Sequence, residues 1–508
     1  MVTICAFRIT FTAAIPSNVV KRYCTGVTFR LQLNAAVIWR SHAYGKVSRV
    51  HVYRGHLLHI SGSPTASTAH LSLVSEPNGA LVVDTHGKIV FSGEFTEVPA
   101  ECASATVTDF RPGFLLPGFV DAHVHFPQVF TTDAYGGGEL LNWLDRCVFP
   151  AEARFSDPDF AREAARAFCA ARVAAGTTAA LVFGSAFPVA QDALFEETQR
   201  IGLRMVSGRG VQTRGPKSAS ALITDDATAE KLCRKEIEKW HCADAPGRFD
   251  EAMLQVALVP RFALSVTPTT FHWMGVLYQE WRDRGLYFHT HLSENDAPGV
   301  GEIDSVIRDF DIPDYLSAYD GRFLPGGASG AESLLGRRTI FAHAVHCSAE
   351  ELNRIAATRS SIAHCPTSQL FLGSGTMPWM QIAARGITIA LGSDVGAGDE
   401  WLISRVANDC FKVHMSTKAP DATALDPAAL LFSATLAGAR ALDMESLFGN
   451  LDSGKDADFI VVDPALWPPL ERSLSGVTDV SGLVFSLLMS MREPAIARVF
   501  VRGAVVST

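Results

Sequence analysis

The sequence predicts an α/β protein: a (β/α)8 TIM-like barrel with a small β-sandwich domain built from both chain ends. From Pro117 to Asp443, strand-like apolar runs alternate with helix-length amphipathic segments. Polar residues follow the carboxyl ends of several of these runs, where a barrel gathers its active site. An open doubly wound sheet is the competing fold, and the placement of the polar residues favours the barrel.

Composition limits the class of protein. The chain has 508 residues, of which 48% are apolar and 19% charged, so neither a small binding module nor a disordered chain fits. With 53 acidic and 44 basic residues, the net charge is -9. We therefore expect a small neutral or cationic substrate, and neither nucleic acid nor a membrane as partner. Ten scattered cysteines without a CxxC pair predict a reducing compartment, the cytoplasm.

The first 49 residues differ from the rest of the chain. They contain no acidic residue, since the first is Glu76, and they carry several Arg, Lys and Ser residues. Such a composition is typical of an organelle transit peptide. An over-extended start or a disordered tail is the alternative interpretation, so we treat residues 1–49 as an N-terminal extension.

The remaining chain divides into three predicted segments: the first half of a β-domain (50–116), the barrel (117–443) and the second half of the β-domain (444–508). Both flanking segments alternate short β-rich runs with turns, which suggests that the two ends build one domain. The barrel strands are expected within residues 119–126, 177–183, 203–211, 253–264, 286–294, 338–345, 361–366 and 387–395. Residues 159–176 and 228–240 have the periodicity of helices.

A metal site is predicted from histidines at strand ends. His123 and His125 are two residues apart on one strand, so both imidazoles face the same side. His289 or His291, of which we prefer the one nearer the strand end, adds a third imidazole, and Asp394 adds a carboxylate. This set suits one Zn²⁺ per subunit, with Fe²⁺ as the alternative, and disfavours Mg²⁺ or Ca²⁺. The predicted ligands are His123, His125, His291 and Asp394.

Two further residues are candidates for catalysis. Glu294 lies three residues beyond His291, where a carboxylate can reach over the metal and move protons. His343 also ends a strand-like run and can orient the attacking water or the substrate. His346 and His364 are interpreted as histidines that satisfy buried carbonyl groups. The fourth predicted strand lacks a lysine, so a single metal is the simpler interpretation.

The motifs PGFVDAHVHFPQ, PRFALS, HTHLSEN, IAHCPTS and LGSDVGAG, in this order, resemble the metal-dependent amidohydrolase superfamily. Within it, PQ after the HxH motif and LLNWLDRCVFPAEARF are similar to the guanine deaminase family. That resemblance implies Zn²⁺ on the four ligands and hydrolytic deamination of guanine to xanthine and ammonia. It implies proton transfer by Glu294 and Asp394, water polarisation by His343, and a homodimer. The purine-binding residues it implies are Gln128, Trp143, Arg261 and the backbone of Phe262.

Four positions depart from the family pattern. Thr367 and Gln369 replace two asparagines, Asn142 replaces a glutamate and Ser393 replaces a threonine. None removes a predicted ligand or proton carrier, so they bear on pocket shape. Three alternatives remain open: another aminohydrolase acting on an oxidised guanine, pterin, triazine or adenosine derivative; a non-catalytic interaction protein of the same fold; and a binuclear amide-ring hydrolase.

Deleting residues 1–49 should leave turnover and the melting temperature nearly unchanged, because the segment lies outside the motif-bearing region. Thermal melting and steady-state kinetics of the shortened chain test this. A large loss of stability would show that the segment packs on the rest of the protein.

Overall fold

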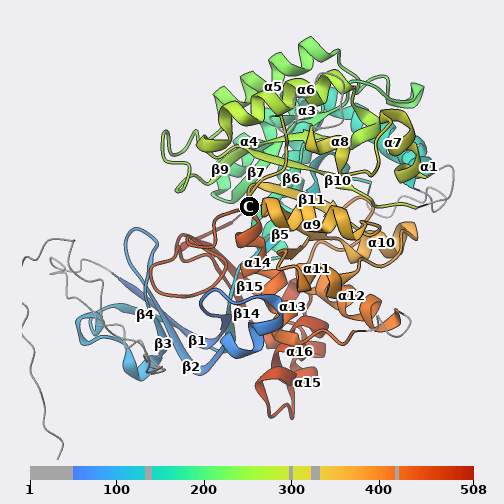
Figure 1. Ribbon diagram of the computed structural model, residues 1–508. Helices are drawn as coiled ribbons and strands as arrows, with labels where there is room; N and C mark the ends of the chain where they lie inside the picture. Colours follow the sequence, from blue (N-terminus) through green and yellow to red (C-terminus); the bar gives the residue numbers. More distant parts are fainter. Residues whose placement is uncertain (1–49, 132–139, 297–300, 322–331, 418–422, 508) are drawn as a thin grey trace, which may run out of the picture. The chain divides into compact units, whose positions relative to one another are not determined.

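Eight parallel strands form a nearly closed barrel in the computed structural model, so the predicted fold class is confirmed (Figure 1). The structure describes residues 50–131, 140–296, 301–321, 332–417 and 423–507, and the predicted extension lies outside them. The barrel strands, in spatial order, are β5 (Phe119–His125), β6 (Thr177–Phe183), β7 (Arg204–Gly208), β9 (Leu254–Pro260), β10 (Tyr287–Leu292), β11 (Thr339–His343), β12 (Ser361–His364) and β13 (Ile389–Leu391). The short β8 (Gly210–Val211) pairs with β9.

These strands are continuous apolar runs because both of their faces are covered. All seven residues of β5, of β6 and of β9 are buried, as expected for a parallel sheet wrapped by helices. The main connecting helices are α3 (Pro158–Ala174), α4 (Pro188–Ile201), α5 (Asp226–Trp240), α6 (Pro268–Trp281), α7 (Glu302–Phe310), α9 (Ala349–Thr358), α11 (Trp379–Ala384) and α12 (Ile403–Ser416). Shorter helices are α1 (Leu140–Trp143), α2 (Phe149–Ala153), α8 (Ser317–Asp320), α10 (Pro366–Leu372), α13 (Pro427–Ala434) and α14 (Leu436–Ala441).

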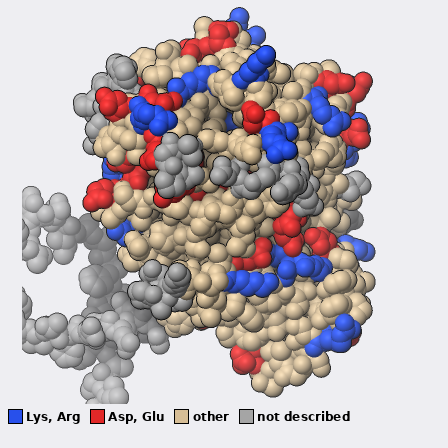
Figure 2. All heavy atoms as spheres, turned by 90° about the vertical axis from the view of Figure 1, so that its right-hand side faces the viewer, with Lys and Arg blue, Asp and Glu red and all other residues tan. Residues whose placement is uncertain are grey.

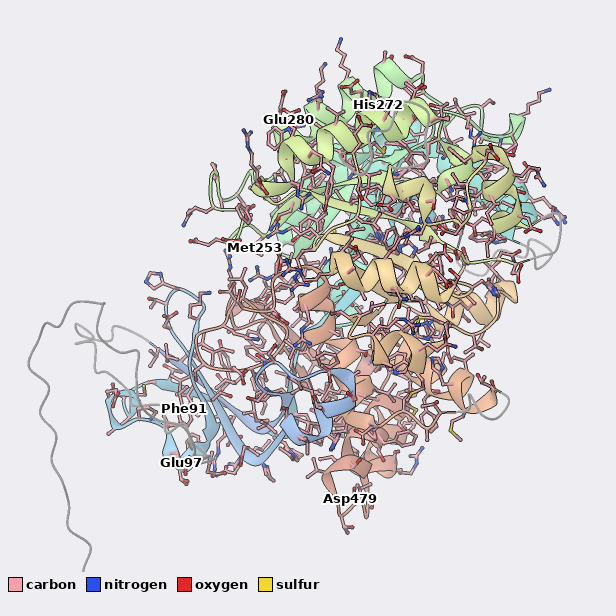
Figure 3. All side chains as sticks on the ribbon, viewed as in Figure 1. Phe91, Glu97, Met253, His272, Glu280 and Asp479 are labelled. Carbon is pink, nitrogen blue, oxygen red and sulfur yellow. The ribbon has the colours of Figure 1, made fainter. Side chains whose placement is uncertain are left out.

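Local sequence signals begin several of these helices. Asp157 accepts a hydrogen bond from the amide of Asp159 (2.8 Å), and Pro158 occupies the first turn of α3. Ser348 and Glu351 form a capping box at the start of α9. On the outer layer, Glu280 of α6 accepts a hydrogen bond from Arg234 of α5 (2.9 Å; Figure 3). Capping therefore fixes where the helices start, while burial of their inner faces holds them on the barrel.

The barrel closes between β5 and β13 through side-chain and single backbone bonds. The amide of Asp394 donates to the carbonyl of His123 (2.9 Å). Ser393, the residue before Asp394, donates hydrogen bonds from its amide and its hydroxyl to the carboxylate of Asp121 (3.0 and 2.5 Å). Burial raises the pKa of Asp121 to about 6, against the opposing effect of the Ser393 hydrogen bonds. Ser393, one of the departures from the family pattern, therefore supplies a hydroxyl to this closure.

Strands from both ends of the chain form one seven-stranded mixed sheet (blue and red in Figure 1). Its order is β16 (Ala504–Val505), β15 (Ile496–Val501), β14 (Phe459–Val462), β4 (Thr106–Pro117), β1 (His51–Ile60), β2 (Leu73–Val83) and β3 (Ile89–Glu94). On β4 and β14, Leu115 and Val461 face a small separate core, whereas Leu116 and Ile460 join the main core with the barrel. Successive side chains on a strand point to opposite faces, so one face of the sheet packs against the barrel and the other forms its own core.

Two helices lie between β14 and β15 that the sequence texture did not predict: α15 (Pro468–Leu474) and α16 (Val480–Ser490). Asp479 begins α16 by accepting a hydrogen bond from the amide of Gly482 (2.8 Å; Figure 3). The indole of Trp467 donates to the carbonyl of Ser490 at the other end of α16 (3.1 Å). Among the described residues, no helix is long and apolar enough to cross a bilayer.

A buried ion cluster joins the barrel to the terminal sheet. Arg204, at the start of β7, donates to Asp456 and to Asp458 (2.5 Å for Asp458), and all three side chains are at most 3% exposed. Because these charges are buried, no solvent compensates the remaining charge if one partner is removed. On the outer surface, by contrast, acidic and basic side chains are interspersed across the face that Figure 2 shows.

Arg204→Met should lower the free energy of unfolding by about 3–5 kcal/mol, because buried Asp458 would lose its cation. Asp456 would keep only the half-exposed Lys88 and Arg502 (2.6 and 3.2 Å). Urea denaturation measures the change. Arg200→Met is the matched control, since Arg200 forms an exposed pair with Glu197 (2.7 Å) whose loss should cost about 0–1 kcal/mol. Equal effects of the two substitutions would contradict the structural role of Arg204.

Candidate functional site

The chemistry-bearing residues lie where barrel strands end. His123 and His125 end β5, His291 lies near the end of β10, His343 ends β11, and Asp394 follows β13. His343 and Asp394 have positive φ values of 72° and 51°, a region that side chains other than glycine rarely adopt. Such strain is common at functional sites, where the surrounding structure holds residues in unfavourable conformations.

Three imidazoles and one carboxylate converge on one point. The Nε2 atoms of His125 and His291 lie 3.1 Å apart, and Asp394 Oδ1 lies 3.2 Å from His125 Nε2 and 3.1 Å from His123 Nε2. Ligand atoms on one tetrahedral zinc ion are about 3.3 Å apart, given Zn–N and Zn–O distances near 2.0–2.2 Å. These three distances thus fit ligands of one metal ion, and His123, His291 and Asp394 also belong, with His343, to a group whose ligand atoms lie within 4.8 Å of one another.

His289 has a different position from His291. Its Nε2 lies 2.7 Å from Nδ1 of His123, and its own Nδ1 lies 2.8 Å from the carbonyl of Ile340. His291 Nδ1 lies 2.5 Å from the carbonyl of Arg261, which leaves its Nε2 for the cluster. The sequence could not separate these two histidines, and the geometry places His291 with the cluster and His289 behind His123, where it can orient that ring.

Glu294 and His343 lie beside the cluster. His343 Nε2 is 3.4 Å from Glu294 Oε2 and 3.8 Å from Asp394 Oδ2, close enough for His343 also to count among possible metal ligands. Burial, then the nearby Asp394 and Glu302 carboxylates, raises the pKa of Glu294 well above its usual value. Burial lowers the pKa of His343 to about 3. Burial thus favours the protonated form of Glu294 and the neutral form of His343, and the two side chains face each other.

Glu302, at the start of α7, supports Glu294 and was not identified from the sequence. Its Oε2 accepts hydrogen bonds from the amides of Glu294 and Asn295 (3.2 and 3.3 Å), and Tyr315 donates its hydroxyl to Oε1. Burial raises the pKa of Glu302 to about 7. A single acid at a helix start reads as an ordinary helix-capping or solvated residue, so no sequence signal marked it.

A pocket opens onto the cluster. Three of its polar lining residues, His125, His291 and Asp394, belong to the cluster. Three more, Gln128, Arg261 and Glu294, were predicted from the sequence. The lining residues are His125, Gln128, Leu140, Trp143, Leu144, Arg261, Phe262, His291, Glu294, Glu302, Leu372, Asp394 and Ala397. All ten residues predicted for the site are therefore brought together at one end of the barrel.

Glu152 of α2 links two of the pocket residues and was also missed. Its Oε2 accepts a hydrogen bond from Arg261 Nη1 (2.7 Å), and its Oε1 accepts one from Gln128 Nε2 (3.1 Å). All three side chains are nearly fully buried. A buried carboxylate of this kind fixes the direction of a guanidinium group, and Arg261 lines the pocket. The signal available was an acid between apolar residues in VFPAEARF.

Gly396, in the loop after Asp394, lets Gln128 approach the backbone. A Cβ atom at this position would lie 1.9 Å from Gln128 Oε1, and the φ angle of +123° is one that only glycine adopts readily. Of the other departures from the family pattern, Thr367 donates to Asp409 (2.9 Å) and Gln369 is buried. Asn142 is exposed on α1. These three therefore lie outside the pocket lining.

The pattern of the Amidohydrolase family matches residues 114–506. The chain belongs to the amidohydrolase family. It is 36% identical to a protein named probable guanine deaminase from Deinococcus radiodurans, over 90% of this chain and 98% of that protein. It is 32% identical to the guanine deaminase of Escherichia coli, over 84% and 90%. The crystal structure of guanine deaminase from Bradyrhizobium japonicum superposes with a TM-score of 0.79, at 27% identity, over 91% of this chain and 99% of that one.

In this member of the amidohydrolase family, substitution can distinguish a residue that binds the metal ion from one that only orients a ligand. His291→Ala should remove the ion from this site, because it deletes one converging nitrogen, whereas His289→Ala should weaken metal affinity by about 10–100-fold. Metal content by plasma mass spectrometry after dialysis against graded chelator tests both. Full metal content in His291→Ala with complete loss in His289→Ala would reverse the two roles.

Proposed function

We propose that the chain is a zinc-dependent guanine deaminase, which converts guanine and water to xanthine and ammonia. The observation that carries the proposal is the pocket itself. Arg261 and Gln128, which both donate to Glu152, line it together with Glu294 and with His125, His291 and Asp394 of the cluster. The names of the D. radiodurans and E. coli relatives support this substrate.

In this proposal His123, His125, His291 and Asp394 hold one zinc ion, with Fe²⁺ as the alternative. The residues fit the ion: burial lowers the pKa of His125 to about 4, so its imidazole is neutral, and Nε2 of His123 has no hydrogen-bond partner among the described residues. The bound ion would lower the pKa of a water molecule to about 7 and so make a nucleophile available at neutral pH. Side chains of the protein bind the purine and transfer the protons.

Glu294 and Asp394 move the protons. Burial raises the pKa of Glu294, which favours its protonated form, and Glu294 donates this proton to the ring nitrogen beside the amino-bearing carbon, which makes that carbon electrophilic. Although burial acts against ionisation, the neighbouring His123 and His125 hold the pKa of Asp394 well below its usual value, so it is charged and accepts a proton from the attacking water. His343 orients that water. Protonation of the exocyclic amine then allows the bond between this amine and the ring carbon to break, and ammonia leaves.

Arg261 and Gln128 select the purine. A guanidinium group donates hydrogen bonds and never accepts them, so it matches the six-carbonyl of guanine and leaves the six-amino group of adenine without an acceptor. Trp143 and Phe262, both buried in the pocket lining, supply flat apolar contacts for the ring. The hydrogen-bond donors of the pocket therefore determine which purine binds, and the histidine–aspartate cluster determines which reaction follows.

The proposal also includes a homodimer working in the cytoplasm. All eight described cysteines are free thiols, and six of them are buried, which suits a reducing compartment. Light scattering of the purified protein measures its oligomeric state, and imaging of the tagged full-length chain measures its location.

A purine panel tests the function. The zinc-loaded protein is incubated with guanine, adenine, 8-oxoguanine and a pterin, and products are identified by chromatography with ammonia release. Xanthine and ammonia from guanine, with little turnover of adenine, are expected. Faster turnover of a pterin or an oxidised guanine would move the assignment to another aminohydrolase, and no turnover of any compound would support a non-catalytic role.

Glu294→Gln should keep the metal and lower kcat by about 10²–10⁴-fold, since the amide retains the shape and a hydrogen bond but cannot deliver a proton. Metal content is measured beside steady-state kinetics, and Glu230→Gln, on the surface of α5, serves as control. A Gln variant with unchanged kcat would exclude Glu294 as the proton donor.

Arg261→Lys should lower kcat/KM for guanine by about 10–100-fold, because the charge remains but the planar fork and its bond to Glu152 are lost. Glu152→Gln should lower it in the same direction, mainly through KM, since it releases Arg261 and Gln128 while the reacting groups stay in place. If both variants kept the wild-type preference for guanine over adenine, these residues would be structural only.

A further inference from the structure

A second group of metal-ligating side chains lies outside the pocket, between the barrel wall and its helical layer. His364 ends β12, and Cys410 and His414 are four residues apart on one face of α12. The three side chains are at most 2% exposed. A nitrogen of each ring and the sulfur of Cys410 all lie within 4.8 Å of one another.

The spacing fits a single ion. The Nε2 atoms of His364 and His414 are 3.2 Å apart. On a tetrahedral zinc ion, with Zn–N near 2.0–2.1 Å and Zn–S near 2.3 Å, ligand atoms are about 3.3–3.6 Å apart. Cys410 is a free thiol. Two imidazoles and one thiolate are a borderline-soft set that favours Zn²⁺ over Mg²⁺ or Ca²⁺.

A hydrogen bond between the two rings does not account for the whole group. It uses one nitrogen of each histidine and leaves Nδ1 of His364 buried without a partner among the described residues. It also gives no role to the thiol of Cys410.

One side of the group borders a second pocket. His414 lines this pocket together with Thr376, Trp379 and Gln381. Trp379 of α11 packs against both histidine rings, at centroid distances of 5.9 and 5.5 Å. The indole therefore covers the apolar side of the group, while the pocket leaves room for a water molecule as fourth ligand.

We propose that His364, Cys410 and His414 form a second zinc site, distinct from the candidate catalytic centre. Zn²⁺ binds one nitrogen of each imidazole and the sulfur of Cys410, whose proton is released to solvent, and water fills the fourth position. The ion joins β12 to α12, the helix that follows the Asp394 loop. Its role is to stabilise this connection, and it takes no part in the reaction.

Metal counting tests the proposal. The protein is purified as it is expressed, incubated with Zn²⁺, freed of excess metal by gel filtration and analysed by plasma mass spectrometry. Two zinc ions per chain are expected. Cys410→Ala and His414→Gln should each lose one ion while kcat stays within about twofold, and His291→Ala should lose the other ion. Cys233→Ala, which removes a buried thiol from α5, is the matched control and should retain both.

Cobalt distinguishes a thiolate site from an all-nitrogen-and-oxygen one. Co²⁺ bound to a thiolate gives an intense sulfur-to-metal charge-transfer band in the near ultraviolet, which the candidate catalytic centre cannot produce because it contains no sulfur ligand. The band is expected in wild type, His291→Ala and Cys233→Ala, and absent from Cys410→Ala.

One zinc ion per chain in the wild type without the cobalt band would overturn the proposal, as would an unchanged band in Cys410→Ala. Circular dichroism of each variant checks folding, and His414→Gln gives an independent answer if Cys410→Ala does not fold. The cobalt result does not involve guanine, so it stands or falls separately from the proposed deamination.

Discussion

Closure of the barrel by one buried carboxylate is the constraint on which the site depends. Asp121 accepts two hydrogen bonds from Ser393 and one from the amide of His123 (3.2 Å), so it holds the first and last strands in register. The two strands carry His123, His125 and Asp394 immediately beyond this contact. A shift of one residue between β5 and β13 would turn these side chains away from one another. Convergence of the candidate ligands is thus a property of the closed barrel.

Burial of charge is the second common theme. Glu152, Glu294 and Glu302 are all removed from water, yet each has a different partner. Glu152 faces a guanidinium, and it directs donors into the pocket. Burial raises the pKa of both Glu294 and Glu302, and for Glu294 the nearby Asp394 and Glu302 carboxylates add to this effect. The same residue type therefore pairs with a cation in one position and favours its protonated form in another.

Sequence reasoning identified strand ends and the residues that follow them, because apolar runs that end in histidine or aspartate are visible within a few positions. The range 177–183, expected as a strand, is β6 itself. Partners from distant segments were not visible: Glu152 meets Arg261, and Asp121 meets Ser393, only in the folded chain. A choice between His289 and His291 needed the ring positions. Helices α15 and α16 were missed because their short apolar segments resemble the strands around them.

The pairing of β14 with β4 places Phe459 opposite Pro117, and this has a consequence for synthesis on the ribosome. Strands β1 to β4 emerge first, but the edge of β4 gains its partner only after almost the entire chain has been translated. Until then that edge offers unpaired backbone groups to other chains. Nascent protein thus passes through a long interval in which chaperones have a defined segment to protect, and a truncation that removes β14 would leave every newly made chain in that exposed state.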